Sequence, residues 1–312
     1  MATLSLEWSA YPPPEFAAGA VTVGNFDGVH LGHRALVVAA REAVKLVGGP
    51  VVVVTFDPPP HVVLHPPSGP LRPPLTTLKD RAVFLQAAGA DHVVILQTGP
   101  ALVALSPEAF FEDVLARQLD ARAIVEGYDF RFGRNRAGTN DTLRTLCQAA
   151  GLAFVEVPQF LHAGEPVSSS RVRSAIVSGD VARAAELLAR PYHIAGTVVS
   201  GAKRGRTIGF PTANLADVPT VLPGNGVYAV RATLDGVTYP AAANVGPNPT
   251  FGEDARKIEV HLLDFSGDVY DKTMTVAFVA RLRETRPFAG VAELIDQLKQ
   301  DVEHARQMLK GE

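Results

Sequence analysis

Short runs of apolar, β-branched residues alternate with longer amphipathic stretches through the first half of the chain. Such a run predicts a buried strand, and a stretch with a period near 3.6 residues predicts a helix. The expected strands cover residues 21–23, 51–56, 92–96, 121–125 and 152–157. The expected helices cover residues 34–46, 78–88, 107–119 and 139–150, with Ser106 as an N-cap and Gly151 as a C-cap. This alternation indicates an α/β, Rossmann-like domain whose parallel sheet is covered on both faces.

A proline-rich segment, residues 57–74, interrupts the alternation. Its prolines are expected to forbid regular structure and to favour a stiff, extended loop. Because a helix and a strand follow it, we interpret it as a flap inside the first domain, with a linker as the alternative. Two further helices are expected at residues 170–176 and 181–189, and the pattern changes after Pro191. We therefore expect domains at residues 1–186 and 187–312.

Period-two strands and turns dominate the second part. We expect strands at residues 193–199, 226–234, 237–243, 257–263 and 273–279. Asp235-Gly236 is a strong hairpin turn between two of them. One helix, residues 291–309, closes the chain. A small β-barrel capped by a carboxyl-terminal helix is the economical fold for this part.

Composition narrows the classes of function. The chain has 312 residues, a formal net charge of −3 and one cysteine, Cys147, in an apolar helical context. Interleaved charges offer no basic stripe for nucleic acid, and no apolar run reaches the length of a membrane span. The amino terminus has no basic run or cleavage site for export, so we expect a soluble, cytoplasmic protein whose partners are small molecules. The oligomeric state does not follow from the sequence.

The stretch GNFDGVHLGH, from Gly24 to His33, follows the first expected strand and leads into a helix that begins near Gly32. This geometry directs backbone N–H groups and the positive end of a helix toward an anion. His30 and His33 would lie on one side of the turn and donate hydrogen bonds to a charged leaving group. A glycine turn with solvated histidines is the alternative, and a zinc site would lack its third and fourth ligands. Neither G-x-x-x-x-G-K-[ST] nor a G-x-G-x-x-G after a strand occurs.

The H-x-G-H turn resembles the motif of the nucleotidyltransferase superfamily. Further stretches extend the likeness: TFDP from Thr55, EGYDFRFG from Glu126, SSSRVR from Ser168, GFPTAN from Gly209 and EVHLLDF from Glu259. In this order they resemble the prokaryotic bifunctional riboflavin kinase/FMN adenylyltransferase family. The resemblance implies an FMN adenylyltransferase in the first domain and a riboflavin kinase in the second. It also implies riboflavin, FMN and FAD as substrates or products, ATP as co-substrate and Mg²⁺ as cofactor.

For the first domain, the resemblance implies that His30 and His33 stabilise the transferring phosphates. The implied contacts to ATP are Gly24, Asn25, Phe26, Asp27, Gly28, Gly32, Ser169, Ser170, Arg171 and Arg173. Asp57, Asp129 and Phe130 are implied flavin contacts. Taken alone, a serine run before a helix is most often a simple cap.

For the second domain, GAKRGRTIGFPTAN resembles the nucleotide loop of the kinase. The implied ATP contacts are Gly201, Lys203, Gly205, Arg206, Thr212 and Asn214, and the last two are also implied Mg²⁺ ligands. The resemblance makes Glu259 the general base and Arg286 and Phe288 flavin contacts. Period-two alternation puts Glu259 on the face opposite its neighbours, so its side chain is expected to enter a barrel mouth. A solvated basic hairpin and an exposed strand glutamate are the alternatives.

One departure from the family pattern concerns the proline-rich segment. Pro59 stands where a histidine is usual, and His61 is the candidate to replace it. Two rival functions stay open: a flavin-binding carrier with decayed modules, and an enzyme with only one of the two activities. Retention of the chemical residues His30, His33, Thr212, Asn214 and Glu259 counts against decay.

Overall fold

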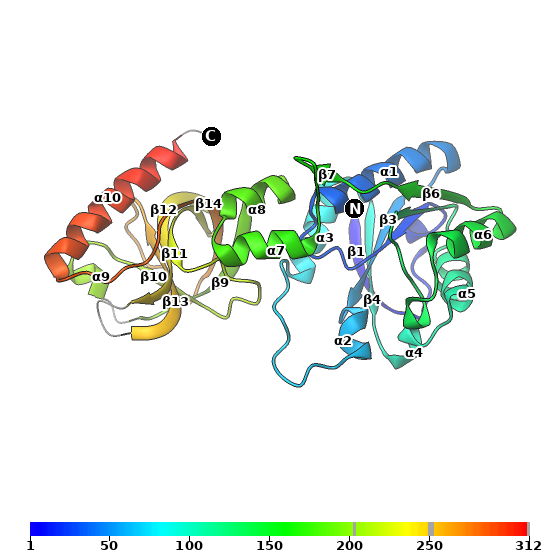
Figure 1. Ribbon diagram of the computed structural model, residues 1–312, viewed down its shortest axis with the longest axis horizontal. Coiled ribbons are helices and arrows are strands. Elements are labelled where there is room, and N and C mark those ends of the chain that lie inside the picture. The colour runs from blue at the N-terminus through cyan, green and yellow to red at the C-terminus, as the bar shows by residue number, and fades with distance from the viewer. Residues whose placement is uncertain (202–203, 249–252, 311–312) are drawn as a thin grey trace. The chain divides into compact units, whose positions relative to one another are not determined.

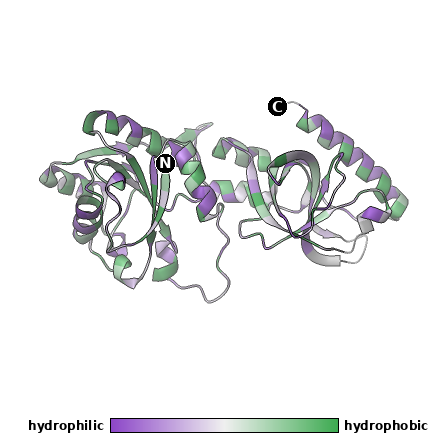
Figure 2. Ribbon diagram, turned by 180° about the vertical axis from the view of Figure 1, so that it is seen from behind, coloured by the Kyte–Doolittle hydropathy of each residue, from purple (hydrophilic) through white to green (hydrophobic). Residues whose placement is uncertain are grey.

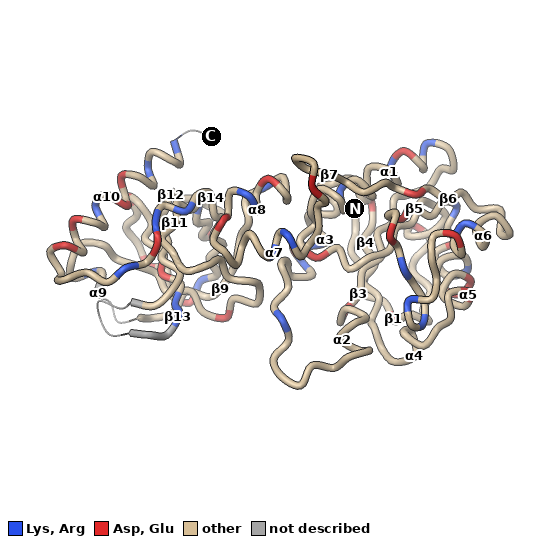
Figure 3. The backbone as a smooth tube through the Cα atoms, in the orientation of Figure 1, with Lys and Arg blue, Asp and Glu red and all other residues tan. Residues whose placement is uncertain are grey.

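The computed structural model describes residues 1–201, 204–248 and 253–310. The chain forms two compact units, coloured from blue to green and from green to red in Figure 1. The first unit contains Met1–Arg72 and Thr76–Ser168, and the second contains Pro73–Leu75 and Ser169–Glu312. The last two residues of the proline-rich segment, Pro73 and Pro74, thus pack with the second unit. Figure 3 shows Lys and Arg interspersed with Asp and Glu in both units.

A parallel sheet forms the centre of the first unit. Its strands are β1 (Ala2–Glu7), β2 (Ala20–Val23), β3 (Val51–Asp57), β4 (His92–Gln97), β5 (Ala123–Gly127) and β6 (Ala153–Val157). They lie in the order β1-β4-β3-β2-β5-β6. The direction of this order reverses between β2 and β5, the kind of point at which parallel α/β sheets bind ligands.

Helices cover both faces of this sheet. One face packs against α1 (Leu31–Val47) and α3 (Leu78–Ala87). The other packs against α4 (Pro100–Val103), α5 (Pro107–Ala109), η2 (Phe110–Gln118) and α6 (Asn140–Ala150). The expected Rossmann-like domain is confirmed. The segment expected as one helix, residues 107–119, begins as α5 and continues as the π-helix η2, and Ser106 Oγ accepts from Ala109 N at 3.1 Å as its cap.

Several short elements of the first unit were not expected. Strand β1 was missed because its alternating residues are half exposed at the edge of the sheet. The proline-rich segment contains the helix α2 (Pro60–Leu64), so the expectation that its prolines forbid regular structure was wrong. A proline in the first turn of a helix needs no N–H partner, which is why Pro60 is tolerated. The remaining short elements are η1 (Pro14–Phe16), η3 (Arg134–Arg136), β7 (Leu161–His162) and β8 (Glu165–Pro166).

The second unit is built on a closed antiparallel barrel. Its strands are β9 (Tyr192–Val199), β10 (Ala213–Ala216), β11 (Gly226–Leu234), β12 (Val237–Asn248), β13 (Glu253–Leu262) and β14 (Thr273–Arg283). Its helices are α7 (Ser169–Ser178), α8 (Val181–Leu188), α9 (Arg204–Thr207) and α10 (Val291–Leu309). The expected barrel with a closing helix is confirmed. Strand β10 was missed because it is short and its first two residues, Ala213 and Asn214, end the PTAN motif, which we interpreted as a loop.

Helix α10 lies along the outside of the barrel (Figure 1). Figure 2 shows hydrophobic and hydrophilic residues alternating along it. Its apolar face carries Ala305 and Leu309, which pack with Ala229 and Leu263 of the barrel wall. Because α10 covers only part of the wall, the outer surface of other strands remains available for function.

Candidate active sites

The turn after β2 is tight, and its backbone enters the left-handed region. Gly24 N bonds to Val54 O at 3.0 Å, and Phe26 and Val29 have φ values of 47° and 43°. A Cβ on Gly24 would lie 3.2 Å from the Phe26 ring, a tight contact that glycine avoids. The Phe26 side chain, expected as a phosphate contact, is buried and packs edge-on against His33 at 5.1 Å. The Phe26 side chain therefore supports the turn by packing.

The structure brings His30 and His33 together. Their rings are stacked, with centroids 3.6 Å apart and an interplanar angle of 17°. His30 is the N-cap of α1, and its Nδ1 accepts from His33 N at 3.3 Å. A Cβ on Gly32 would lie 3.2 Å from the His30 ring. The H-x-G-H spacing thus lets the first imidazole cap the helix while the second packs on it.

A buried arginine that sequence reasoning missed supports the same turn. Arg81 of α3 is 4% exposed, its Nη1 donates to Thr55 Oγ1 at 3.2 Å, and its Nη2 lies 3.7 Å from Asp27 Oδ1. Thr55 Oγ1 in turn donates to Asn25 O at 3.1 Å. Burial lowers the pKa of the Arg81 guanidinium, and the carboxylates of Asp27 and Asp57 oppose that shift. The charge stays on the arginine because its ordinary pKa is so high.

Thr76 adds a second tie to the turn. Its backbone N donates to Asp27 Oδ1 at 3.2 Å, and its Oγ1 accepts from Gly28 N at 3.2 Å. Asp27 and Gly28, both expected phosphate contacts, are therefore held by Thr76, and Asp27 is also held by Arg81 of α3. Local sequence gives little signal for this network, because Arg81 lies in the helix LKDRAVFLQA beside other polar residues.

Glu126 lies at the point where the strand order reverses. Strands β2 and β5 pair through Ala20↔Ala123 and Val21↔Ile124. Beyond those pairs, Val23 N donates to Glu126 Oε1 at 2.7 Å instead of to a strand carbonyl. Burial raises the pKa of the Glu126 carboxyl well above its ordinary value, although this hydrogen bond opposes the shift. Burial thus favours the protonated form of this carboxyl where the two strands separate.

The expected flavin contacts of the first unit lie at the carboxyl ends of strands. Asp57 ends β3 and is exposed, and Asp129 is exposed in the turn after β5. Phe130 stacks on Phe132, with centroids 5.5 Å apart and an interplanar angle of 13°. Pro59 is the N-cap of α2 and His61 is exposed on that helix. The parallel sheet gathers these positions at one edge, together with the turn that carries His30.

The serine and arginine run of the motif SSSRVR opens α7, in the second unit. Ser169 and Ser170 form its first turn, where backbone N–H groups point outward from the helix end. Arg173 Nη1 donates to Pro73 O at 2.6 Å. Part of the proline-rich segment is therefore anchored to the helix that carries the expected triphosphate contacts.

Three polar side chains form a row across neighbouring strands of the barrel. Glu259 of β13 pairs with Asn214 of β10 on one side and with Asn244 of β12 on the other. Ile258 and Val260, its neighbours along the strand, are buried in the barrel. Strand alternation therefore places Glu259 on the outer face of the wall, and not in the barrel mouth as expected. Asn244 was not selected from sequence, although it begins the stretch NVGPNPTF.

Two described glycines of the expected nucleotide loop lie close to Asn214 of this row and to Thr212. A Cβ on Gly201 would lie 2.3 Å from Asn214 Nδ2 and 3.1 Å from its Oδ1. A Cβ on Gly205 would lie 2.2 Å from Phe210 O and 3.5 Å from Thr212 Oγ1. Both glycines let the backbone pass close to the oxygens of Thr212 and Asn214. Arg206 is exposed on α9, and Lys203 lies outside the described residues.

The oxygens of Thr212, Asn214 and Glu259 are hard ligands of the kind that Mg²⁺ takes. Asn214 and Glu259 come from adjacent strands on one face of the wall, and the backbones of Gly201 and Gly205 lie close to Asn214 and Thr212. The donor set therefore fits Mg²⁺. Among the described residues, no three His, Cys, Asp or Glu side chains gather as a metal site.

Arg286 and Phe288, the expected flavin contacts, lie between β14 and α10. The Arg286 guanidinium carbon is 5.0 Å from the centre of the Phe288 ring, and its Nη2 donates to Gln297 of α10 at 3.1 Å. Arg283, at the end of β14, forms a bidentate pair with Asp301 of α10 at 2.8 to 3.1 Å. The segment is therefore fixed to the closing helix beside the outer face of the barrel.

An H-x-G-H turn on a parallel sheet and a carboxylate-bearing barrel define a chain with two transferase modules. Residues 13–171 match the family described as FAD synthetase, and residues 188–309 match the family described as riboflavin kinase. The chain belongs to the bifunctional riboflavin kinase/FMN adenylyltransferase family, which confirms the resemblance found in the sequence.

Curated relatives carry that family name. The protein of Pseudomonas fluorescens is 38% identical and the alignment covers 94% of each chain. The protein of Bacillus subtilis is 36% identical over 93% of this chain and 92% of its own. The protein of Escherichia coli K12 is 36% identical over 92% of this chain and 91% of its own.

One solved structure matches nearly the whole fold. It is a crystal structure from Streptococcus pneumoniae whose title names a macrolide-efflux protein, with a TM-score of 0.89 and 33% identity. The match covers 97% of this chain and 98% of that one. None of the helices in the described part of our chain has the length and apolar character that a bilayer crossing requires.

Proposed function

We propose that this chain phosphorylates riboflavin to FMN and then adenylylates FMN to FAD, with ATP as the donor in both steps. One observation carries the proposal: a single chain matches two transferase families over successive ranges, residues 13–171 and 188–309. We place the module boundary at residues 186/187, between the two matches. The compact units divide earlier because α7 and α8 cluster with the barrel. The reaction consumes ATP, so we also propose a cytoplasmic location.

In the adenylyl transfer, a phosphate oxygen of FMN attacks the α-phosphorus of ATP and pyrophosphate leaves. No covalent enzyme intermediate is needed, so the residues align the reactants and neutralise charge. The stacked His30 and His33 would donate hydrogen bonds to the phosphates as charge moves to the leaving group. Ser169, Ser170, Arg171 and Arg173 would hold the triphosphate through a helix start and two guanidiniums.

In the kinase step, the 5'-hydroxyl of riboflavin attacks the γ-phosphorus of ATP and ADP leaves. Glu259 would accept the hydroxyl proton as the bond to phosphorus forms. Mg²⁺, when bound by Thr212 and Asn214, neutralises negative charge on the ATP phosphates. Asn214 and Asn244 lie on either side of Glu259 and would orient its carboxylate.

A time course tests the proposal. The pure protein is incubated with riboflavin, Mg²⁺ and excess ATP, and the three flavins are separated by chromatography. We expect FMN to rise and then to give way to FAD. Glu259→Ala should stop FMN formation but still convert supplied FMN, whereas His30→Ala should stop only FAD formation. Both effects should exceed about a hundredfold, the scale of a lost acid–base group.

Two other results would each contradict the bifunctional function. Accumulation of FMN without FAD, even when FMN is supplied, would indicate a kinase alone. Absence of any product would indicate a flavin-binding protein. Omitting Mg²⁺ should abolish both steps, and activity without any divalent cation would remove the role of Thr212 and Asn214 as metal ligands.

A further inference from the structure

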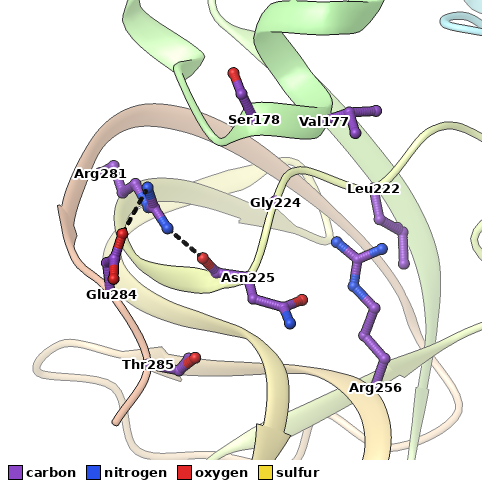
Figure 4. Close-up of a pocket in the computed structure, with 9 residues that line it drawn as sticks. All are labelled: Val177, Ser178, Leu222, Gly224, Asn225, Arg256, Arg281, Glu284 and Thr285. Carbon is purple, nitrogen blue, oxygen red and sulfur yellow. Dashed lines mark hydrogen bonds and ion pairs between the residues drawn. The ribbon is translucent and has the colours of Figure 1, made fainter.

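The second unit contains a polar pocket that the proposed function does not use. Its volume is about 500 Å³, and it is lined from the end of α7, the loop before β11, strand β13 and the end of β14 (Figure 4). None of its lining residues is among the residues assigned to ATP, flavin or Mg²⁺. A volume of this size accommodates a small organic molecule.

Two arginines reach into this pocket from different strands. Arg256 lies on β13 and Arg281 on β14, and Figure 4 shows both directed toward the loop that carries Asn225. Both guanidiniums act on the same buried hydroxyl: burial raises the pKa of Tyr228, and the charges of Arg281 and Arg256 oppose that shift. The two cations therefore converge on one region at the end of the barrel.

The loop before β11 fixes both guanidiniums. Three successive carbonyl oxygens accept from the barrel: Pro223 O from Arg256, Gly224 O from Tyr228 Oη at 2.5 Å, and Asn225 O from Arg281 at 2.5 Å. A guanidinium has five N–H donors in a planar fork, and the carbonyls of Pro223 and Asn225 each occupy one donor of a different arginine. The loop thus holds the two forks in place without neutralising them.

The charge in the pocket is not balanced by its own side chains. Among the lining residues, Glu284 carries the negative charge; it is 3.9 Å from Arg281, and its side chain is 85% exposed. An exposed pair at that separation contributes little. Asn225, Ser178 and Thr285 add an amide and two hydroxyls to the lining. The pocket thus combines two cations with one exposed carboxylate and neutral hydrogen-bonding groups. This set of groups is complementary to an anion.

We propose that this pocket binds the phosphate group of a small phosphorylated molecule. The planar guanidinium of an arginine matches the oxygens of a phosphate better than a point charge does. Two guanidiniums can hold one phosphate dianion. The pocket is larger than a free phosphate ion requires, so an organic remainder fits beside it. Organic phosphate esters and inorganic phosphate share this chemistry, and the experiment separates them.

Isothermal titration of the full chain with two probes, ribose 5-phosphate and inorganic phosphate, tests the proposal. Leu222 lines the pocket and is assigned to neither reaction, so Leu222→Glu adds a carboxylate beside the guanidiniums, and Leu222→Gln adds the same volume without charge. We expect Leu222→Glu to weaken binding of ribose 5-phosphate at least tenfold relative to Leu222→Gln. Arg256→Gln should weaken it to a similar extent. Equal loss for both probes would identify phosphate itself as the ligand, and loss for the sugar phosphate alone would identify an ester.

Two outcomes would overturn the proposal. One is the absence of binding of either probe to the native chain at millimolar concentration. The other is equal affinity of Leu222→Glu and Leu222→Gln for ribose 5-phosphate. The catalytic sites are unaltered in both variants, so equal affinity would mean that those sites account for all of the binding. Thermal unfolding of the two Leu222 variants gives the folding control, since both lose the same apolar side chain.

Discussion

Arg81 shows how one side chain can organise a site that it does not enter. Its guanidinium is buried between Thr55 and Asp27, and it joins α3 to the end of β3 and to the turn after β2. A buried cation is costly unless it is paired, so the position of Asp27 is set by Arg81 as much as by the turn. The electrostatic attraction between Arg81 and Asp27 therefore helps to hold the turn that presents His30.

Arg81→Met should impair adenylyl transfer and leave the kinase step intact. Methionine fills the space but removes the hydrogen bond to Thr55 and the partner of Asp27, so the unfolding free energy should fall by about 2 kcal/mol. We expect a loss of FAD formation of at least about tenfold in kcat, partly restored by Arg81→Lys. The two steps are assayed separately with riboflavin and with FMN.

Arg41→Met is the matched control for this change. Arg41 pairs with Asp91 at 2.8 Å near the amino ends of β3 and β4, away from the turn, and its side chain is 39% exposed. Its replacement should leave both activities within about twofold, since half-exposed pairs contribute little. Adenylyl transfer that survives intact in Arg81→Met would refute the supporting role of Arg81.

Glu126 makes the stability of the first unit depend on pH. Its pKa is raised by burial in the folded chain, so the folded state holds a proton that the unfolded state releases near the ordinary pKa. Stability therefore falls as the pH rises from the ordinary pKa of a glutamate toward the raised pKa. Glu126→Gln keeps an oxygen for Val23 N and removes this dependence.

We expect Glu126→Gln to be more stable than the native chain at pH 7.5 and equally stable near pH 4. Urea unfolding at the two pH values measures the difference. Glu156→Gln, on the neighbouring strand β6, is the control, because that carboxylate lies at the surface in a pair with Arg144. A stability difference that does not change between the two pH values would contradict a neutral, buried Glu126.

At the scale of elements, the attachment of α10 to the barrel depends on a charge pair. Asp301 is 4% exposed and accepts from both Nε and Nη2 of Arg283, and Gln297 Nε2 donates to its Oδ1 at 3.0 Å. These bonds hold the end of β14, and with it the segment that carries Arg286 and Phe288. The position of that segment is thus a property of the helix as well as of the loop.

Asp301→Asn should loosen this attachment. The substitution leaves Arg283 without its counter-charge, and we expect the unfolding free energy to fall by about 2 kcal/mol. This loss is smaller than the full cost of breaking a buried pair because Arg283 is partly exposed. The KM for riboflavin should rise several-fold while FAD formation from FMN is unchanged. Asp296→Asn, an exposed position on the same helix, should alter neither; an unchanged riboflavin KM in Asp301→Asn would contradict the role of the pair.

Elements with strong local patterns could be predicted from the sequence, and those defined by neighbours could not. The buried strands β3 and β4, the Asp235-Gly236 hairpin and helix α10 were all expected, because each has a pattern that is complete within itself. Strand β10 was missed because Ala213–Ala216 is short and its pairing with β9 and β13 depends on distant segments.

The same distinction applies to the sites. The proximity of His30 and His33 follows from their spacing at the start of a helix, and the sequence predicted it. Arg81, Glu126 and Asn244 act through partners far away in the chain, so their roles could not be inferred locally, although Glu126 begins the motif EGYDFRFG and Asn244 the stretch NVGPNPTF. The face on which Glu259 lies was mistaken because period two fixes which residues share a face but not which face is inside the barrel.

At the scale of the whole molecule, the two units have separate cores. In the first, side chains of α1 and α3 pack on one face of the parallel sheet; in the second, the barrel interior is filled by its own strands. A substitution in one core should therefore destabilise one unit and leave the other folded.

Leu85→Ala in α3 and Ile194→Ala in β9 test this independence. Both side chains are fully buried, and each truncation should cost about 2–5 kcal/mol. We expect Leu85→Ala to lower only the midpoint temperature of the transition that coincides with loss of FAD formation. We expect Ile194→Ala to lower only the midpoint temperature of the transition that coincides with loss of FMN formation. Calorimetry followed by activity measurements identifies the transitions, and a shift of both by either change would show that the units unfold as one.

The edge position of β1 affects the order in which the first unit is assembled during synthesis. Ala2 pairs with His92, so β1 leaves the ribosome long before its partner β4 exists, whereas β2 and β3 pair across the shorter separation from Ala20 to Val51. Closing the longer loop costs more entropy and waits for more chain. The nascent chain therefore carries β1 unpaired while the centre of the sheet forms, and docking of β1 onto β4 completes that half of the sheet.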